Sequence, residues 1–207
     1  MRSRRKVNLL LLGLLLETFN EENKMNIKPG FTSLFNGKDL SGWIGDTKYW
    51  SVKDGCIVAS SVDGLKRNLF LWTEKEYSNF VMSSEIRLLG FNSGIQYRSV
   101  VDDNGVMAGY QADIGDGCWG SLYEERLRGV IVPYKPQLVE PILKKEDWNE
   151  FQIVAVDDYM ILILNGVVTV ELYDPSGAKK GLFGLQLHGG PPQEIFFRNL
   201  CIKEFGI

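Results

Sequence analysis

The chain has few of the residues that build metal and redox sites. It contains one histidine and three cysteines, and Cys56, Cys118 and Cys201 lie far apart, with no CxxC or Cys/His cluster. This spacing does not match the clustered ligands of a structural zinc site. Buried free thiols are the expected state of the cysteines. A divalent metal ion held by carboxylate and carbonyl oxygens stays open, although no EF-hand spacing is present.

Basic runs and long apolar runs are also scarce. The net charge is -3, and Lys and Arg cluster only at the extreme N-terminus, so nucleic acid is not an expected partner. The apolar stretch Val7 to Leu16 is too short to form a stable membrane span. It follows four basic residues, which is the pattern of a secretory signal, but no small-residue cleavage site comes after it.

The N-terminus therefore has two interpretations. Either the protein is exported to the periplasm or the extracellular space, or translation begins at Met25 and the protein is cytoplasmic. In both cases we expect residues 1–24 to lie outside the fold and residues 29–207 to form one domain. With 44% hydrophobic residues, the chain can bury a substantial core.

A chain that begins at Met25 should be as stable as the full chain, because the removed segment shows no strand pattern. The measurement is the melting temperature of both proteins under the same conditions. A clear decrease on truncation would contradict this expectation.

Short alternating strands dominate the remainder of the chain. Hairpin turns are indicated at Asp54-Gly55 and Asn165-Gly166, and no long run has helical periodicity. A stretch with three prolines, from Gly115 to about Asp147, is expected to be an irregular loop. The pattern predicts an all-β fold, a sandwich of two antiparallel sheets.

Polar residues recur two apart in three successive predicted strands. Side chains alternate faces along a strand, so each pair should share one face, with Ile86, Tyr97 and Ala112 on the opposite face. A glycine, Gly94, lies on the polar side and leaves room for close approach. The stripe could line a concave ligand surface or be an ordinary solvated face. Its members are Glu85, Arg87, Gln96, Arg98, Gln111 and Asp113.

Two further segments could add to this surface. Tyr123 and Glu124 follow a glycine-rich stretch that could fold over the stripe or form an exposed turn. His188 is the only histidine and follows Gln186 on the same face, at a strand end beside glycines and prolines. No GxSxG elbow is present, so a serine nucleophile is not indicated.

Several segments together resemble the 3-keto-disaccharide hydrolase domain family. These are GFTSLFNGKDLSGW, NSGIQYRS, GYQADIGDGCWGSLYEE, the WN and LNG pair, and LQLHGG with FRNLCIKE, in this order from Phe31 to about Phe205. The resemblance implies a concanavalin A-like jelly roll and an exported protein. It also implies a site on the concave face, made of Glu85, Arg98, Gln111, Asp113 and His188, with Tyr123 and Glu124 from the next loop.

The resemblance further implies chemistry at a 3-keto sugar. A base near C2–H, an acid near the leaving oxygen and a donor or metal ion for the enolate oxygen would be required. Asp113, Glu85 or His188 could be the base, Glu124 or Tyr123 the acid, and Arg98 or a divalent metal ion the enolate stabiliser. Hydrolysis by the two carboxylates Glu85 and Asp113 is a second route.

A non-catalytic, lectin-like carbohydrate-binding module is the alternative function. It would need aromatic platforms, for which Trp119 and Tyr123 are available, together with amides such as Gln96, Gln111 and Gln186. The several ionisable groups in the stripe favour the enzyme. Carbohydrate is the expected partner in both cases.

Overall fold

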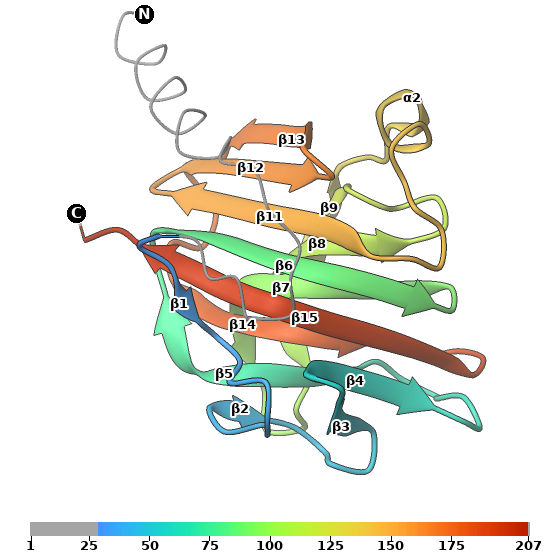
Figure 1. The fold of residues 1–207 in the computed structure, drawn as a ribbon. Helices are drawn as coiled ribbons and strands as arrows, with labels where there is room; N and C mark the ends of the chain where they lie inside the picture. Colours follow the sequence, from blue (N-terminus) through green and yellow to red (C-terminus); the bar gives the residue numbers. More distant parts are fainter. Residues whose placement is uncertain (1–28, 207) are drawn as a thin grey trace, which may run out of the picture.

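Residues 29–206 are described by a computed structural model, in which two antiparallel sheets pack face to face (Figure 1). The first sheet has eight strands, with β1 (Thr32–Ser33) paired to β15. Its other strands, in spatial order, are β13 (Val167–Tyr173), β12 (Tyr159–Leu164), β11 (Asn149–Val156), β6 (Phe80–Leu89), β15 (Gln193–Glu204), β4 (Cys56–Ser61) and β3 (Trp50–Lys53).

The second sheet has seven strands and carries most of the predicted site residues. In spatial order they are β10 (Gly129–Val132), β9 (Leu122–Glu125), β8 (Met107–Gly115), β7 (Asn92–Val101), β14 (Gly181–Leu187), β5 (Leu69–Tyr77) and β2 (Trp43–Ile44). The two-sheet, nearly all-β architecture confirms the predicted fold class.

One hydrophobic core fills the space between the sheets. The ring of Phe80 on β6 meets the ring of Phe183 on β14 edge to face, with centroids 4.7 Å apart, and so links the two sheets. Ile86, Tyr97 and Ala112 are fully buried in this core, as the alternation pattern predicts. Burial of these alternate residues sets the face that every neighbouring polar residue must take.

The two predicted hairpin turns are confirmed. Asp54-Gly55 joins β3 to β4, and Asn165-Gly166 joins β12 to β13. All four residues have φ between 46° and 81°, which is the conformation of a type I′ turn. Asn and Gly adopt it at low cost, so these dipeptides determine where the strands reverse.

The prediction of an irregular loop from Gly115 to about Asp147 is wrong in part. This segment contains two strands, β9 and β10, and the short helix α2 (Pro136–Val139). The two strands pair through a tight turn in which Arg126 has φ 59°. Strands of four residues give too few positions for an alternation pattern to be visible in the sequence. The strand assignment matters because β9 carries Tyr123, Glu124 and Glu125.

The three polar strands do not all lie in one sheet. β7 and β8 pair with each other in the seven-stranded sheet, whereas β6 lies in the eight-stranded sheet between β11 and β15. The chain thus crosses from one sheet to the other after β6. Local alternation predicts which residues face outward, but it carries no information about which sheet a strand joins.

The N-terminal segment 1–24 lies outside the described residues. That this segment directs export remains a prediction. Within residues 29–206, no helix is long and apolar enough to cross a membrane.

Arg98 occupies an irregular position in β7. The register with β8 shifts between Tyr97 and Val100, and Arg98 has φ 48°, as in a β-bulge. Its buried guanidinium donates to the carbonyl oxygens of Ser78 at 2.8 Å, Asp157 at 2.8 Å and Ala178 at 3.3 Å. Arg98 therefore ties three loops at one end of the sandwich together.

Replacing Arg98 by alanine should lower the free energy of unfolding by about 3 kcal/mol, because buried carbonyl groups lose their donors. Arg126→Ala is the matched control, since Arg126 also has positive φ but forms an exposed ion pair with Asp102. That control should cost less than about 1 kcal/mol. Urea unfolding measures both values, and equal losses would contradict the role given to Arg98.

Candidate functional site

Three buried glutamines form a hydrogen-bonded cluster on the outer face of the seven-stranded sheet. Gln96 Nε2 donates to Gln111 Oε1 at 2.6 Å, and Gln186 Nε2 donates to the same oxygen at 3.0 Å. Gln96 and Gln186 are 0% exposed. Core residues flank each glutamine along its strand, so all three project away from the hydrophobic core. We call this surface, with Asp113 and Glu125, the polar face.

Gly94 gives the cluster its room. A Cβ at Gly94 would overlap the side chain of Gln111, which lies across β7 at this point. The space that the sequence suggested for a ligand is therefore filled by Gln111. The glycine allows the long amide to lie flat and to reach Asp113.

Asp113 is held on the polar face by two donors. Gln111 Nε2 donates to Oδ1 at 2.6 Å and Ser121 Oγ donates to Oδ2 at 3.0 Å. The residue is 8% exposed. Burial raises its pKa from 3.8 to about 6, the Glu125 carboxylate adds to the increase, and the two hydrogen bonds and His188 oppose it. A carboxyl group of this pKa can exchange protons near neutral pH.

Glu125 is the second carboxylate of the polar face. Gln186 Nε2 lies 3.4 Å from its Oε2, and burial raises the pKa of the Glu125 carboxyl. The sequence prediction missed this residue and selected Glu124. Recognising Leu122–Glu125 as a strand would have found it, because buried Leu122 places Tyr123 and Glu125 together on the outer side.

His188 follows the end of β14, beside the polar face. Its Nδ1 lies 2.6 Å from the carbonyl oxygen of Gly189, and its ring packs edge to face on Phe91 with centroids 5.5 Å apart. A carbonyl can only accept, so Nδ1 carries a proton and Nε2 is the nitrogen that can exchange one. His188 lies two residues beyond Gln186, which belongs to the polar face.

Tyr123 shares the outer side of β9 with Glu125 and is half-buried. Gly129 on β10 faces its ring, because a Cβ there would lie 3.8 Å from Tyr123 Cε2. The structure thus places Tyr123 on a strand of the sheet and not on a loop that folds over it, as a neighbour of Gln111 across the β8–β9 pair.

Glu85 does not join these residues. It projects from the outer face of the other sheet, where Arg198 Nη2 lies 2.6 Å from one carboxylate oxygen and Asn199 Nδ2 donates to the other at 2.7 Å. The prediction that Glu85 converges with Asp113 is wrong. The predicted outward direction of Glu85 is correct, because its neighbour Ile86 is buried. However, β6 belongs to the eight-stranded sheet, so Glu85 faces away from Asp113.

Arg98 and Glu124 also leave the predicted cluster. The bulge in β7 turns Arg98 toward the loops described above, away from Gln96. Glu124 points to the opposite side of β9 from Glu125 and pairs with Arg128, which also contacts Asp174 at 2.6 Å. The Asp174 carboxylate is further bonded by Tyr110, and these contacts hold the pKa of Asp174 below its usual range.

Trp119 is a core residue. It is 5% exposed and packs with the residues between the sheets, so it cannot serve as a platform for a sugar ring. The prediction that Trp119 contacts a sugar is therefore wrong, because this large aromatic side chain is buried in the hydrophobic core.

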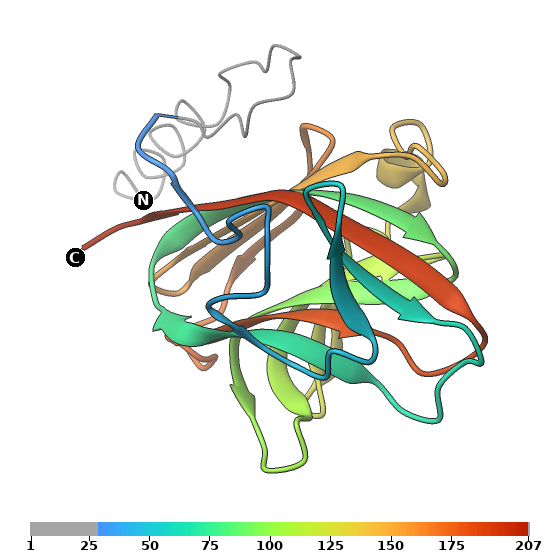
Figure 2. The ribbon, with the colours of Figure 1, turned by 60° about the horizontal axis from the view of Figure 1, so that its bottom comes forward.

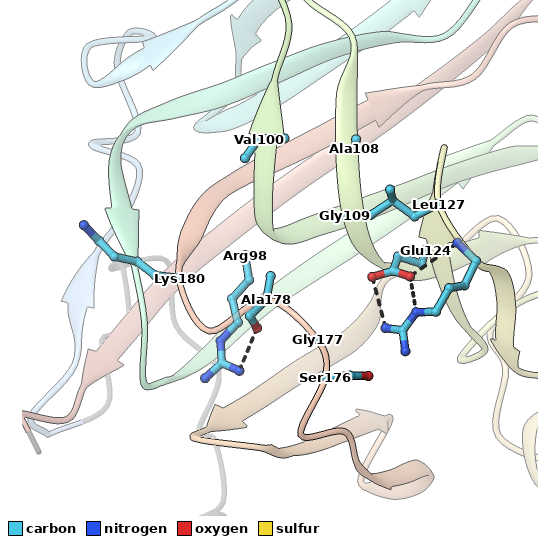
Figure 3. Close-up of a pocket in the computed structure, with 11 residues that line it drawn as sticks. Arg98, Val100, Ala108, Gly109, Glu124, Leu127, Ser176, Gly177, Ala178 and Lys180 are labelled. Carbon is cyan, nitrogen blue, oxygen red and sulfur yellow. Dashed lines mark hydrogen bonds and ion pairs between the residues drawn. The ribbon is translucent and has the colours of Figure 1, made fainter.

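A cavity of about 380 Å³ lies next to Arg98 and Glu124. It is bounded by β7, β8, β9 and the loop between β13 and β14, as Figure 3 shows. Val100, Leu127, Gly177 and Ala178 are among the residues that line it. Neither Asp113 nor the three glutamines line it, so this cavity is separate from the polar face.

The sequence left a site for a divalent metal ion open. Within residues 29–206, no group of three or more His, Cys, Asp or Glu side chains is arranged to hold one.

A family model described as the 3-keto-alpha-glucoside-1,2-lyase-like domain matches residues 30–203. The chain belongs to this family. The matched range contains Gln96, Gln111, Asp113, Glu125 and Gln186, so the whole polar face lies within the family domain. Among curated proteins, no sequence matches the chain.

Solved structures share the fold. Two proteins from Parabacteroides distasonis, each described as a candidate glycosyl hydrolase, have TM-scores of 0.65 and identities of 24% and 22%. The alignments cover 84% and 90% of this chain and 99% of each of those chains. The carbohydrate-binding module CBM66 from Bacillus subtilis has a TM-score of 0.61 at 18% identity, over 84% of this chain and 100% of that chain. At these identities the likeness establishes the two-sheet fold.

The raised pKa of Asp113 makes the stability of the protein dependent on pH. The folded chain binds this proton more tightly than the unfolded chain, whose carboxyl group has a pKa near 3.8. The group therefore costs nothing below pH 3.8, and it lowers the free energy of unfolding as the pH rises through about 6.

Asp113→Asn should remove this dependence. At pH 7 the variant is expected to gain up to about 3 kcal/mol in free energy of unfolding, and near pH 3 it should equal the wild type. Urea unfolding between pH 3 and pH 8 measures the difference. A difference that stays constant over this range would show that the Asp113 carboxyl group does not titrate differently in the folded protein.

Proposed function

We propose that the protein is an enzyme that cleaves 3-keto glycosides at the polar face. The observation that carries the proposal is the buried Asp113 carboxyl, with a pKa of about 6, held by Gln111 on the face that also carries the Glu125 carboxyl. His188 lies two residues beyond Gln186 of the same face. Membership of the 3-keto-alpha-glucoside-1,2-lyase-like family supports the same substrate class. Perturbed carboxyl groups that cluster on one surface are characteristic of acid–base sites.

The proposed reaction begins with removal of a proton. A ketone at C3 acidifies the hydrogen on C2, because the resulting carbanion is delocalised as an enolate. When the carbonyl re-forms, a C1=C2 double bond forms and the C1–oxygen bond breaks, so that the substituent leaves with a proton. Water then adds across C1=C2, with hydroxyl at C1 and hydrogen at C2, and the sum is hydrolysis.

Asp113 is the proposed base. Its pKa of about 6 leaves it ionised at neutral pH and still basic enough to take the C2 proton. The hydrogen bonds from Gln111 and Ser121 fix the orientation of the carboxylate before substrate arrives. Such preorganisation removes the cost of orienting the base during the reaction.

His188 and Glu125 take the other proposed roles. His188, at the end of β14, donates a proton to the departing oxygen through Nε2. Glu125 binds sugar hydroxyl groups with Gln186, whose buried Oε1 has no hydrogen-bond partner among the described residues. The hydroxyl of Tyr123 is the proposed donor to the enolate oxygen.

A lectin-like carbohydrate-binding module is the second candidate. The glutamine cluster favours it, because buried amides are typical groups for recognising sugar hydroxyls, and CBM66 has the same fold. Such a module would bind an unmodified oligosaccharide without turnover. Both functions make carbohydrate the proposed partner, and an exported protein would encounter such substrates outside the cytoplasm.

The enzyme should cleave a 3-keto-glucoside and leave the corresponding ordinary glucoside intact, because only the ketone stabilises the carbanion. Asp113→Asn should reduce kcat by about 100- to 10,000-fold while the protein stays folded. The measurement is release of para-nitrophenol from the two glucosides. Full turnover by Asp113→Asn would assign the base to His188.

Glu124 and Glu125 provide a matched control, since they are sequence neighbours on opposite faces of β9. Glu125→Gln should lower kcat/KM, whereas Glu124→Gln should leave kcat/KM unchanged and reduce stability, because Arg128 loses a partner. If the wild type cleaves no keto glucoside but binds an unmodified oligosaccharide, the binding-module function is correct.

A further inference from the structure

The hairpin between β7 and β8 leaves the plane of its sheet. The bulge after Tyr97 bends one strand, and Gly109, at φ 143°, bends the other where it meets Ser99. Figure 2 shows this lime-coloured hairpin projecting from the two-layer body. We call residues 100–108 the arm.

The arm is held in one conformation by its own hydrogen bonds. Asp102 accepts from the backbone N–H groups of Asn104 at 2.9 Å and Val106 at 3.0 Å, and its other carboxylate oxygen pairs with Arg126 at 2.9 Å. These contacts fix the geometry of the arm.

The arm packs on the outer face of the sheet, next to the glutamine cluster. Met107 is fully buried, and its sulfur occupies the position that a Cβ at Gly184 would take. Gly184 is paired with Gln96 and lies between two core residues, so its open side is the polar side. Met107 consequently covers the sheet beside Gln96.

Trp72 and Arg67 hold the tip of the arm. Trp72 is paired with Gly184 in the sheet, and a Cβ at Gly105 would lie 3.3 Å from its ring. Arg67 donates to the carbonyl oxygen of Asn104 at 3.3 Å. The tip thus extends over β14 toward β5, and the polar face ends at this barrier.

The residues of the polar face lie at different distances from the arm. The row Gly184, Gln96 and Gln111 lies nearest Met107, Asp113 is paired one row further with Gly94, and His188 follows the end of β14. His188, Tyr123 and Glu125 are half-buried, whereas Gln96 and Gln186 are fully buried. Glu125 is paired with Gly109 at the base of the arm, and Tyr123 is paired with Gln111. A ligand can therefore approach over His188 and the β9 edge but cannot extend past Met107.

We propose that the arm makes the site selective for a terminal sugar. In this arrangement, which rests on the proposed function, the far side of the reacting sugar faces the arm without touching the buried Met107, and its C1 substituent extends past His188 toward solvent. A sugar that carries a further residue on its far side would overlap the arm. The substrate class is therefore a saccharide whose keto sugar is terminal and unsubstituted, and the arm acts by exclusion.

Two para-nitrophenyl substrates test this selectivity. One is the 3-keto-glucoside, and the other carries an additional glucosyl residue on O4 of the keto sugar. The wild type should cleave the extended substrate with a kcat/KM at least about 100-fold lower. Equal cleavage of both would overturn the role of the arm while leaving the proposed reaction intact.

Met107→Ala should admit the extended substrate, with at least about a 10-fold gain in its kcat/KM and less than about a 3-fold change for the terminal one. Met107→Leu conserves volume and should retain the wild-type preference. Val130→Ala, an exposed apolar truncation on the outermost strand of the same sheet, is the remote control. If Met107→Ala does not fold, Trp72→Ala opens the same end and is used instead. A folded variant with the wild-type preference would contradict the proposal.

Failure of the proposed reaction gives a different result. If the wild type cleaves neither substrate, calorimetry with the unoxidised glucoside and its O4-extended analogue still tests the arm. Preferential binding of the unextended sugar would support the arm and refute the reaction. Equal binding, or no binding of either sugar, would overturn both.

Discussion

The hydrogen bond from Gln111 to Asp113 is the contact on which the polar face depends. It exists because Gly94 leaves room for the Gln111 side chain, and because Gln96 and Gln186 donate to the carbonyl oxygen of the same amide. An amide whose oxygen is occupied in this way must direct its N–H toward Asp113. The network thus sets the orientation of the carboxylate and removes it from water, and burial in turn raises its pKa.

Residues with positive φ lie at the edge of the polar face. Arg98 and Gly109 both adopt positive φ at the bend of the β7–β8 hairpin, and the buried guanidinium of Arg98 holds the loops beneath it. Bulges of this kind commonly re-aim strands beside functional surfaces. The same bend that removes Arg98 from the polar face places Met107 on it. The displacement of Arg98 and the proposed selectivity for a terminal sugar therefore both follow from the bend of the β7–β8 hairpin.

Neighbouring residues on β9 have separate tasks because a strand has two faces. Glu125 lies with the glutamines on the polar side, whereas Glu124 pairs with Arg128 close to Tyr110 and Asp174. The polar face contains incompletely satisfied groups, such as the Gln186 carbonyl oxygen, while the Arg128 cluster contains matched charges. One side of β9 thus stabilises the fold through Glu124, and the other side carries Glu125 of the proposed site.

Local sequence patterns are sufficient to predict the sandwich, the two type I′ turns and the side of each strand that Gln96, Gln111, Asp113 and Gln186 occupy. These features follow from local patterns, since alternate burial and turn conformations depend on neighbours in the chain. Four features become visible only in the folded protein: Glu85 lies in the other sheet, Arg98 turns away at a bulge, Trp119 is buried, and Glu125 takes the place predicted for Glu124. Each of these depends on which strands pair and in what register, and those choices are made by contacts between residues distant in the sequence.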